Sequence, residues 1–329
     1  MKKSLTYDDI QLVPRYSEIP SRNDIKLHTL LTKRYGLLNP IVASPMDTVC
    51  ELEMAWKMFR LGGVGCVHRF NTIEEQSEII KKLCHRIYIS EEPPFWMDWG
   101  VHLDDWHAEM QDVPIMAAIG VSEDDKKRAT KLVESGCNVI LIDVAHGHHK
   151  NVKHILEWCR KNLDDKVDYI AGNIATSEAA QELESWGVDG LRVGIGGGSL
   201  CTTRIKTGFG IPNVSCLEDI TSVSKTPVMA DGGIRTSGDI SKALALGASQ
   251  VMLGSLIAGT DEAPGEIIET TKGLYKRYRG SASLETKVTH GQKTRNVEGE
   301  STTIPYKGGV KFIVNGLIDG VKSALSYGG

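Results

Sequence analysis

The stretch PVMADGGIRTSGDISKALALGASQVMLGS, residues 227–255, contains the unit that decides the fold. Two short apolar runs rich in strand-forming residues, 227–233 and 249–255, flank a segment with helical periodicity, 237–248. The helical segment opens on Thr and Ser with an acid close behind and stops at Gly, which are residue types that cap helices. This order predicts two parallel strands joined by a right-handed crossover through a helix.

The same alternation runs through most of the chain. The apolar, strand-like runs are 40–49, 63–69, 114–121, 139–145, 169–175, 190–196, 227–233 and 249–255. The helical patterns that follow most of them are 51–63, 72–84, 122–136, 151–163, 176–187 and 237–248. Eight such units fit a closed (β/α)₈ barrel, the TIM barrel of the α/β class, better than an open sheet. We therefore expect one barrel domain over residues 1–329.

Two segments interrupt this pattern. Residues 86–113 carry three tryptophans and many acids, and we expect a short excursion that packs against the barrel, with a stacking surface as the alternative. Residues 275–310 are polar and dotted with glycine, which predicts a C-terminal flap or lid.

Composition restricts the partners and the location. A formal net charge of −4 lacks the basic footprint of nucleic-acid binding, so no nucleic-acid partner is expected. No apolar run approaches the roughly 18 residues of a membrane span, and the start MKKSLTYDD lacks a signal peptide's apolar region. The seven cysteines form no Cys-x-x-Cys pair, which argues against structural disulfides and zinc. We expect a cytoplasmic protein with no membrane partner.

Polar residues and glycines gather where the predicted strands end. They are Ser44, Asp47, His68, Arg69, Asp143, His146, Asn173, the 194–210 loop, Asp231, Gly232, Gly233, Gly254 and Ser255. In a barrel the carboxyl ends of the strands share one rim, and active sites are built there. The sequence therefore predicts a site on this rim.

The rim loop GIGGGSLCTTRIKTGFG, residues 194–210, surrounds one cysteine with glycines. Glycine lets the backbone approach a ligand closely or adopt left-handed angles. Arg204 and Lys206 are near enough in sequence to Cys201 to favour its thiolate, which predicts a nucleophile. The alternative is a flexible loop with an incidental cysteine.

Two turns of small residues suggest a phosphate group beside this loop. DGGI (231–234) and GS (254–255) offer backbone N–H groups at the positions where barrels commonly hold phosphate. The alternative is a pair of tight turns without a ligand. In DVAHGHH (143–149) the histidine spacing does not complete a metal site, and Asp143 as a polar contact for a cofactor is the favoured interpretation.

Several long motifs together resemble the IMP dehydrogenase/GMP reductase family along nearly the whole chain. They are SPMDTV (44–49), GIGGGSLCTTRIKTGFG (194–210), ADGGIRTSGD (230–239), VMLGSLIAG (251–259), YRGSAS (278–283) and NVEG (296–299). The resemblance implies a (β/α)₈ barrel, a homotetramer, and a loop cysteine that attacks C2 of a purine nucleotide.

Two departures bear on which activity of the family is expected. The dehydrogenases normally insert a pair of CBS modules where this chain has only the 86–113 excursion. Their flap also carries an Arg-Tyr pair that activates water, whereas 284–297 reads LETKVTHGQKTRNV, without that pair. The segments 68–70 and 206–210 and the SYGG end are similar to the bacterial reductase form.

The resemblance also implies a role for individual residues. Cys201 is the expected nucleophile, Thr203 would bond the departing amine, and Glu285 would act as general acid, although the family's Glu stands where this chain has Leu284. The implied nucleotide-binding residues are Ser44, Asn173, Ser199, Asp231, Gly232, Gly233, Gly254, Ser255, Tyr278, Gly280, Ser281, Ala282, Glu298 and Gly299. The implied cofactor-binding residues are Ser21, Arg22, Arg69, Asp143, Val144, Ala145 and Gly196. The implied potassium ligands are the carbonyls of Gly196, Gly198 and Cys201.

The activity implied is reduction of GMP to IMP and ammonia with NADPH, through a thioimidate on Cys201. The alternatives are an IMP dehydrogenase without CBS modules and a catalytically silent nucleotide-binding barrel.

Overall fold

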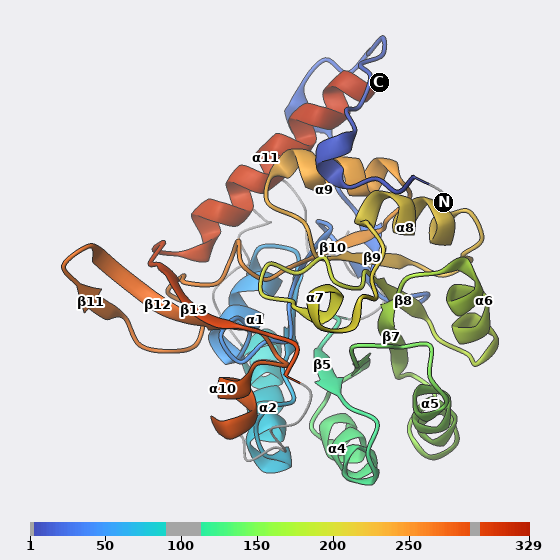
Figure 1. Ribbon diagram of the computed structural model, residues 1–329, viewed down its shortest axis with the longest axis vertical. Coiled ribbons are helices and arrows are strands. Elements are labelled where there is room, and N and C mark those ends of the chain that lie inside the picture. The colour runs from blue at the N-terminus through green and yellow to red at the C-terminus, as the bar shows by residue number, and fades with distance from the viewer. Residues whose placement is uncertain (1–2, 90–112, 290–296) are drawn as a thin grey trace.

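Eight parallel strands close into a ring in the order β10-β3-β4-β5-β6-β7-β8-β9 (Figure 1). The structure is a computed structural model that describes residues 3–89, 113–289 and 297–329. The ring strands are β3 (Ile41–Ala43), β4 (Val64–Val67), β5 (Met116–Ile119), β6 (Val139–Asp143), β7 (Asp168–Ile174), β8 (Gly190–Val193), β9 (Val228–Asp231) and β10 (Gln250–Leu253). Each lies within one of the predicted runs, or within a residue of it, so the predicted TIM barrel is confirmed.

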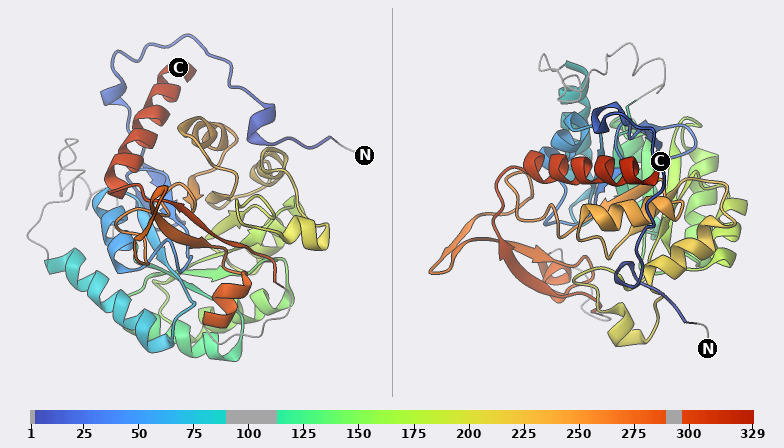
Figure 2. Two further views of the ribbon diagram at one scale, coloured as in Figure 1. Left: turned by 60° about the vertical axis from the view of Figure 1, so that its left-hand side comes forward. Right: turned by 90° about the horizontal axis from the view of Figure 1, so that it is seen from above.

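Helices alternate with these strands and surround the ring (Figure 2). They are α1 (Leu52–Arg60), α2 (Ile73–Ile89), α4 (Glu123–Glu134), α5 (Lys150–Asn162), α6 (Ser177–Ser185), α7 (Thr203–Thr207), α8 (Asn213–Thr221) and α9 (Ser237–Ala245). The start of the predicted 86–113 excursion belongs to α2, and residues 90–112, with its tryptophans, lie outside the described residues. Among the described residues no helix is both long and apolar enough to cross a membrane.

The predicted cap of α9 forms as a reciprocal pair. The Thr236 hydroxyl accepts the Asp239 N–H at 3.2 Å, and the Asp239 carboxylate accepts the Thr236 N–H at 3.0 Å. This capping box satisfies backbone donors that the first turn of a helix leaves without partners. It also fixes where the chain leaves the turn after β9, next to the predicted site.

The strands bury both faces. Alternate residues such as Ile140 and Ile142 pack against the surrounding helices, while Val139, Leu141 and Met229 fill the inside of the ring. Burial on both faces explains why the strands read as continuous apolar runs in the sequence.

A hairpin that the sequence did not predict closes the amino-terminal end of the ring. It is formed by β1 (Thr29–Leu30) and β2 (Gly36–Leu37), and Leu31 between them is fully buried in the inner core. The Thr32 hydroxyl donates to Asp168 at 2.7 Å, and Asp168 begins β7. One end of the barrel is thereby plugged, which leaves the other end for a ligand.

The described part of the predicted flap, 275–310, contributes two strands to an antiparallel sheet. The sheet contains β11 (Ile268–Thr270), β12 (Gly273–Arg279) and β13 (Ser301–Pro305), and it extends away from the ring (Figure 1). The short helix α10 (Leu284–Thr289) follows β12. Near its base the flap returns to the barrel, because the Glu300 N–H donates to the Leu200 carbonyl at 3.1 Å.

The chain ends in α11 (Val310–Gly328), which the sequence analysis also did not predict. It packs on α9, and the amino-terminal arm runs beside its last turns (Figure 2). The Arg15 N–H donates to the Tyr327 carbonyl at 2.8 Å. Because this contact joins the two ends of the sequence, no local pattern reports it.

Candidate active site

A cavity of about 310 Å³ opens at the carboxyl ends of the ring strands. Its volume is at the lower end of the roughly 300–1,000 Å³ common for small-molecule sites. The predicted residues that line it are Ser44, Arg69, Asp143, Val144, Ala145, Asn173, Gly196, Gly198, Ser199, Cys201, Thr203, Asp231, Tyr278, Gly280, Ser281 and Ala282. Part of the predicted rim therefore lines this cavity, whereas its lining does not include Asp47, His68, His146, Gly232, Gly233, Gly254 or Ser255.

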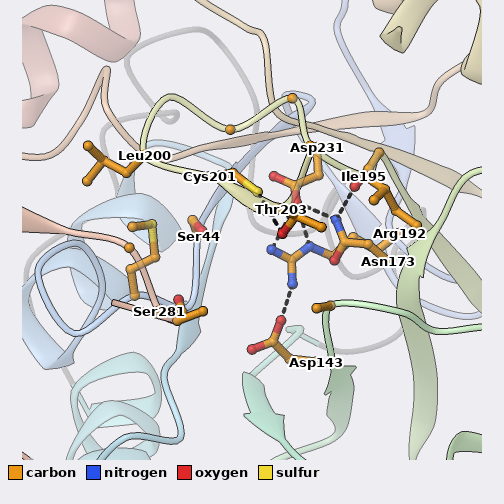
Figure 3. Close-up of a pocket in the computed structure, with 18 of the residues that line it drawn as sticks. Ser44, Asp143, Asn173, Arg192, Ile195, Leu200, Cys201, Thr203, Asp231 and Ser281 are labelled. Carbon is orange, nitrogen blue, oxygen red and sulfur yellow. Dashed lines mark hydrogen bonds and ion pairs between the residues drawn. The ribbon is translucent and has the colours of Figure 1, made fainter. Parts of the chain in front are cut away.

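Cys201 lies half-buried at the edge of this cavity, just before α7 (Figure 3). Its N–H donates to the Gly198 carbonyl at 3.1 Å, which closes a tight turn. Its thiol donates to the Thr203 hydroxyl at 3.3 Å, so among the described residues its side-chain hydrogen bond goes to a hydroxyl and not to Arg204 or Lys206.

The Thr203 hydroxyl in turn donates to the Glu298 carboxylate at 2.8 Å. Two backbone hydrogen bonds hold Glu298 in place: the Thr202 N–H donates to its carbonyl at 3.0 Å, and its own N–H donates to the Ala282 carbonyl at 3.1 Å. The result is a series thiol, hydroxyl, carboxylate. A proton can pass along such a series without any large movement.

Glu285, the acid predicted to act with Thr203, lies elsewhere. Its carboxylate accepts from Arg277 at 2.6 Å, from Arg279 at 3.4 Å and from the Ser301 hydroxyl. The hydrogen bond from Ser301 and the two guanidinium groups lower the pKa of Glu285. The structure thus places the Glu285 carboxylate away from Thr203, and the carboxylate that Thr203 contacts is that of Glu298.

The predicted phosphate turns lie directly behind the cysteine loop. Gly232 has φ +88°, and a Cβ there would lie 2.8 Å from the carbonyl carbon of Gly197. Only glycine permits both the backbone angle and this close approach. Gly233 faces the reverse side of the same loop, in a second cavity, so Gly232 and Gly233 support the loop rather than line the first cavity.

The second predicted turn, at Gly254 and Ser255, meets the flap through Tyr278. A Cβ on Gly254 would lie 3.1 Å from the Tyr278 hydroxyl. That hydroxyl is 3.2 Å from the Ser199 hydroxyl, and burial raises the pKa of Tyr278. Tyr278 is therefore a neutral hydrogen-bonding group that joins the flap to the cysteine loop.

Arg192, which the sequence analysis missed, occupies the centre of the site (Figure 3). It lies on β8 and forms ion pairs with Asp143 and with Asp231. Burial by itself lowers the pKa of Arg192, but Asp231 and Asp143 outweigh this effect and hold the pKa above its usual value. The signal was present in the sequence, because a charged residue inside the buried run 190–196 requires a partner.

Some predicted residues lie away from the cavity. Ser21 caps the short helix at Arg22–Asp24, and the Arg22 guanidinium lies 5.9 Å from the ring centre of Tyr327 on α11. Within one chain the structure does not bring Ser21 or Arg22 to the site. Gly299 pairs with Cys201 and with Ser283 as isolated β-bridges and so connects the flap to the loop.

The predicted potassium loop stays a prediction. Of its three carbonyls, that of Gly198 already accepts the Cys201 N–H. A carbonyl oxygen has a second lone pair, so this hydrogen bond leaves room for a cation contact.

A family model described as "IMP dehydrogenase / GMP reductase domain" matches residues 4–329. The inosine-5'-monophosphate dehydrogenase of Cryptosporidium parvum is 39% identical over 361 residues, covering 99% of this chain and 88% of that protein. The GMP reductase of Leishmania donovani is 31% identical over 451 residues, covering 100% and 92%. Relatives of both activities align over lengths well beyond that of this chain, 451 residues for the Leishmania reductase and 444 for the dehydrogenase of Nitrosopumilus maritimus, so the short 86–113 excursion does not distinguish the two activities.

Comparison with solved structures agrees with the family that the sequence motifs indicate. A crystal structure of a cysteine-to-alanine variant of GMP reductase from Trypanosoma brucei, in complex with guanosine 5'-monophosphate, superimposes with a TM-score of 0.86 at 30% identity, covering 99% of this chain and 92% of that one. With a family model spanning nearly its whole length and relatives of both activities, this chain belongs to the IMP dehydrogenase/GMP reductase family of oxidoreductases.

Proposed function

We propose that this protein is a GMP reductase that converts GMP and NADPH to IMP, ammonia and NADP⁺. The observation that carries the proposal is the hydrogen-bonded series from the Cys201 thiol through Thr203 to the Glu298 carboxylate, at the wall of a cavity of about 310 Å³. This series supplies a nucleophile, a positioned hydroxyl and a proton acceptor within one small volume.

In the first step the Cys201 sulfur attacks C2 of GMP. Its proton passes to the Thr203 hydroxyl, whose own proton passes to Glu298. The sulfur–carbon bond forms, the C2–N bond to the amino group breaks, and the amine takes a proton from Glu298 through Thr203 and leaves as ammonia. The product is a thioimidate that joins Cys201 to the purine.

In the second step the sulfur–carbon bond breaks. NADPH, bound against Asp143, Val144 and Ala145, would supply the hydride that C2 receives as the sulfur leaves. Cys201 regains a proton and IMP is released. The chain's own contribution is to hold the purine over the sulfur and to exclude water, through the flap residues Gly280, Ser281 and Ala282 that line the cavity.

The absence of an Arg-Tyr pair from the flap segment 284–297 supports reduction over hydrolysis. Hydrolysis of the covalent intermediate in the dehydrogenases needs an Arg-Tyr pair that activates water. The dipeptide Arg277-Tyr278 precedes the GSAS turn and is not that pair; Arg277 forms an ion pair with Glu285, and the Tyr278 hydroxyl lies within hydrogen-bond distance of the Ser199 hydroxyl. The rival activity, oxidation of IMP with NAD⁺, is the one named for the Cryptosporidium relative.

Paired assays test the proposal directly. The purified protein is incubated with GMP plus NADPH and, separately, with IMP plus NAD⁺, and the nicotinamide absorbance is followed. Consumption of NADPH with GMP, and no NADH from IMP, is the expected result. NADH formation from IMP would show that the protein is an IMP dehydrogenase and refute the proposal. The absence of reaction in both assays would favour a catalytically silent nucleotide-binding barrel.

The covalent step has its own test. Cys201→Ala is expected to abolish turnover while GMP binding, measured by calorimetry, stays within about threefold of the original protein, because the sulfur acts on the purine only during the reaction. Cys84→Ala is the matched control, since Cys84 is also half-buried but bonds the Ser135 carbonyl on the outer helices. Turnover by Cys201→Ala would refute the mechanism.

A further inference from the structure

Arg192 connects two walls of the cavity that the proposed function assigns to different substrates. Its Nε and Nη2 both lie 3.0 Å from one oxygen of Asp231, and its Nη1 bonds Asp143 (Figure 3). Asp143 ends β6 and Asp231 ends β9, while Arg192 lies on β8 between them. One guanidinium group therefore reaches across the floor of the site.

The contacts continue beyond Arg192 on both sides. Asp143 also faces Arg69 at 3.5 Å, and Asp231 accepts the Asn173 side-chain amide at 2.7 Å. The five side chains form one row in the order Arg69, Asp143, Arg192, Asp231, Asn173. The cofactor is assigned to the Asp143 end and the nucleotide to the Asp231 end, an assignment that rests on the proposed function.

Burial shields the centre of this row from water. The Arg192 side chain is 9% exposed, and those of Asp143 and Asp231 are 13% and 20% exposed. A guanidinium is a planar fork whose donors have fixed directions, so a shift of one carboxylate moves the donors offered to the other. Without the cation, two carboxylates would share a poorly hydrated floor, and one of them would lose charge or turn away.

We propose that Arg192 is a positioning residue that couples binding of the nucleotide to binding of the nicotinamide cofactor. A ligand that bonds Asp231 fixes Arg192 and thereby fixes Asp143 for the second ligand. The coupling acts in both directions with the same factor, because linkage between two binding sites is reciprocal.

The coupling is measured with unreactive pairs. The Kd of GMP is determined by calorimetry with and without saturating NADP⁺, and the Kd of NADP⁺ with and without GMP. Each ligand is expected to lower the Kd of the other by the same factor, about threefold or more. In Arg192→Met the factor is expected to fall to near one, and the KM of GMP and that of NADPH are each expected to rise about tenfold.

Substitutions of the two carboxylates test the route of the coupling. In the original protein, Asp143→Asn is expected to raise the Kd of GMP as well as that of the cofactor. Asp231→Asn is likewise expected to raise the Kd of the cofactor as well as that of GMP. In the Arg192→Met background, Asp143→Asn is expected to raise only the Kd of the cofactor, and Asp231→Asn only the Kd of GMP. An Arg192 variant that raises one KM alone, or that leaves the coupling factor unchanged, overturns the proposal.

Two controls separate positioning from folding. Arg160→Met removes another guanidinium paired with a buried carboxylate, Asp189, at the opposite end of the barrel, and is expected to leave the coupling factor unchanged. Arg192→Lys keeps a cation without the fork and is expected to lose most of the coupling. If both Arg192 variants fail to fold, the cross-effects of Asp143→Asn and Asp231→Asn in the original chain decide, and their absence overturns the proposal.

Failure of the proposed function is distinguishable from failure of this inference. If the protein oxidises IMP and does not reduce GMP, the same binding measurements are made with IMP and NADH. Coupling that depends on Arg192 in that pair supports the inference while the reductase assignment falls.

Discussion

Glu298 and Glu285 are both acids of the flap, and the contacts of each carboxylate distinguish their roles. Glu298 reaches the Thr203 hydroxyl, whereas Glu285 is held by Arg277, Arg279 and Ser301. Glu285 follows the YRGSAS turn closely, whereas Glu298 lies farther along the chain. Glu298 reaches the site because the chain passes the cysteine loop again on its way back to the barrel. Proximity in sequence to a motif is a weaker guide to chemistry than a hydrogen bond to the reacting group.

Glu298→Gln is expected to lower kcat by about 100-fold or more, since the amide still accepts a hydrogen bond from Thr203 but no longer accepts its proton. Steady-state kinetics at saturating substrate measures this. Circular dichroism of the variant verifies that the flap substitution leaves the fold intact.

The matched control is Glu285→Gln, which is expected to keep kcat within about threefold of the original value. Both substitutions remove one flap carboxylate and differ in whether that carboxylate contacts Thr203. A loss with Glu285→Gln as large as that with Glu298→Gln would return the proton-transfer role to Glu285.

At the scale of elements, α9 shows how a local signal positions a distant group. The Thr236–Asp239 capping box starts the helix, and the Arg235 N–H also donates to Asp239 at 3.0 Å. These bonds order the turn that follows Gly232 and Gly233. The turn behind the cysteine loop therefore depends on a cap that belongs to the next helix.

Thr236→Ala is expected to lower the free energy of unfolding by about 1 kcal/mol, because the Asp239 N–H loses its cap acceptor. Denaturant unfolding followed by circular dichroism measures the change. Thr236→Ser keeps the cap oxygen and is expected to stay within about 0.5 kcal/mol of the original protein. An equal loss in both variants would mean that the methyl group and not the cap carries the effect.

The flap is tied to the barrel by charge at the end of β12. Arg279 bonds Asp47 in the loop after β3, at 2.8 Å and 2.9 Å, and Asp47 is nearly fully buried. Gly280 follows Arg279 directly, so this ion pair sets where the flap residues that line the cavity begin. A buried ion pair of this kind fixes geometry more reliably than it adds stability.

For the molecule as a whole, function and stability lie at opposite ends of the barrel. The amino-terminal end is sealed by the β1–β2 hairpin, with Leu31 in the inner core and Gln250 donating to the Leu31 carbonyl at 3.2 Å. The carboxyl end holds the cavity. Substitutions at the sealed end should therefore change stability without changing substrate affinity.

Leu31→Ala is expected to lower the free energy of unfolding by about 3 kcal/mol, because it removes a fully buried side chain from the inner core and leaves a cavity there. KM for both substrates is expected to stay unchanged at temperatures where the variant is folded. Leu30→Ala is the control: Leu30 is the adjacent residue and 53% exposed, so its loss should cost under about 0.5 kcal/mol. Equal costs would contradict the proposed plug.

The sequence by itself determined the ring of strands and helices, because each βα unit is encoded within about 30 residues. Strand runs, caps such as Thr236 with Asp239, and closing glycines are all local, and eight such units in order leave few ways to close. The cysteine loop and the glycine turns could likewise be recognised in the sequence, since each is a run of residues that are neighbours along the chain.

Only the tertiary structure decided which distant groups meet. Glu298 and Thr203 are 95 residues apart, Arg192 is 49 residues from Asp143 and 39 from Asp231, and the hairpin at Leu31 seals strands from the whole chain. Such contacts depend on how the flap returns and on the barrel register, which no local pattern reports. The physical reason is that each βα unit is encoded by neighbouring residues, whereas the partner of a side chain at the site depends on how all the units close into the ring.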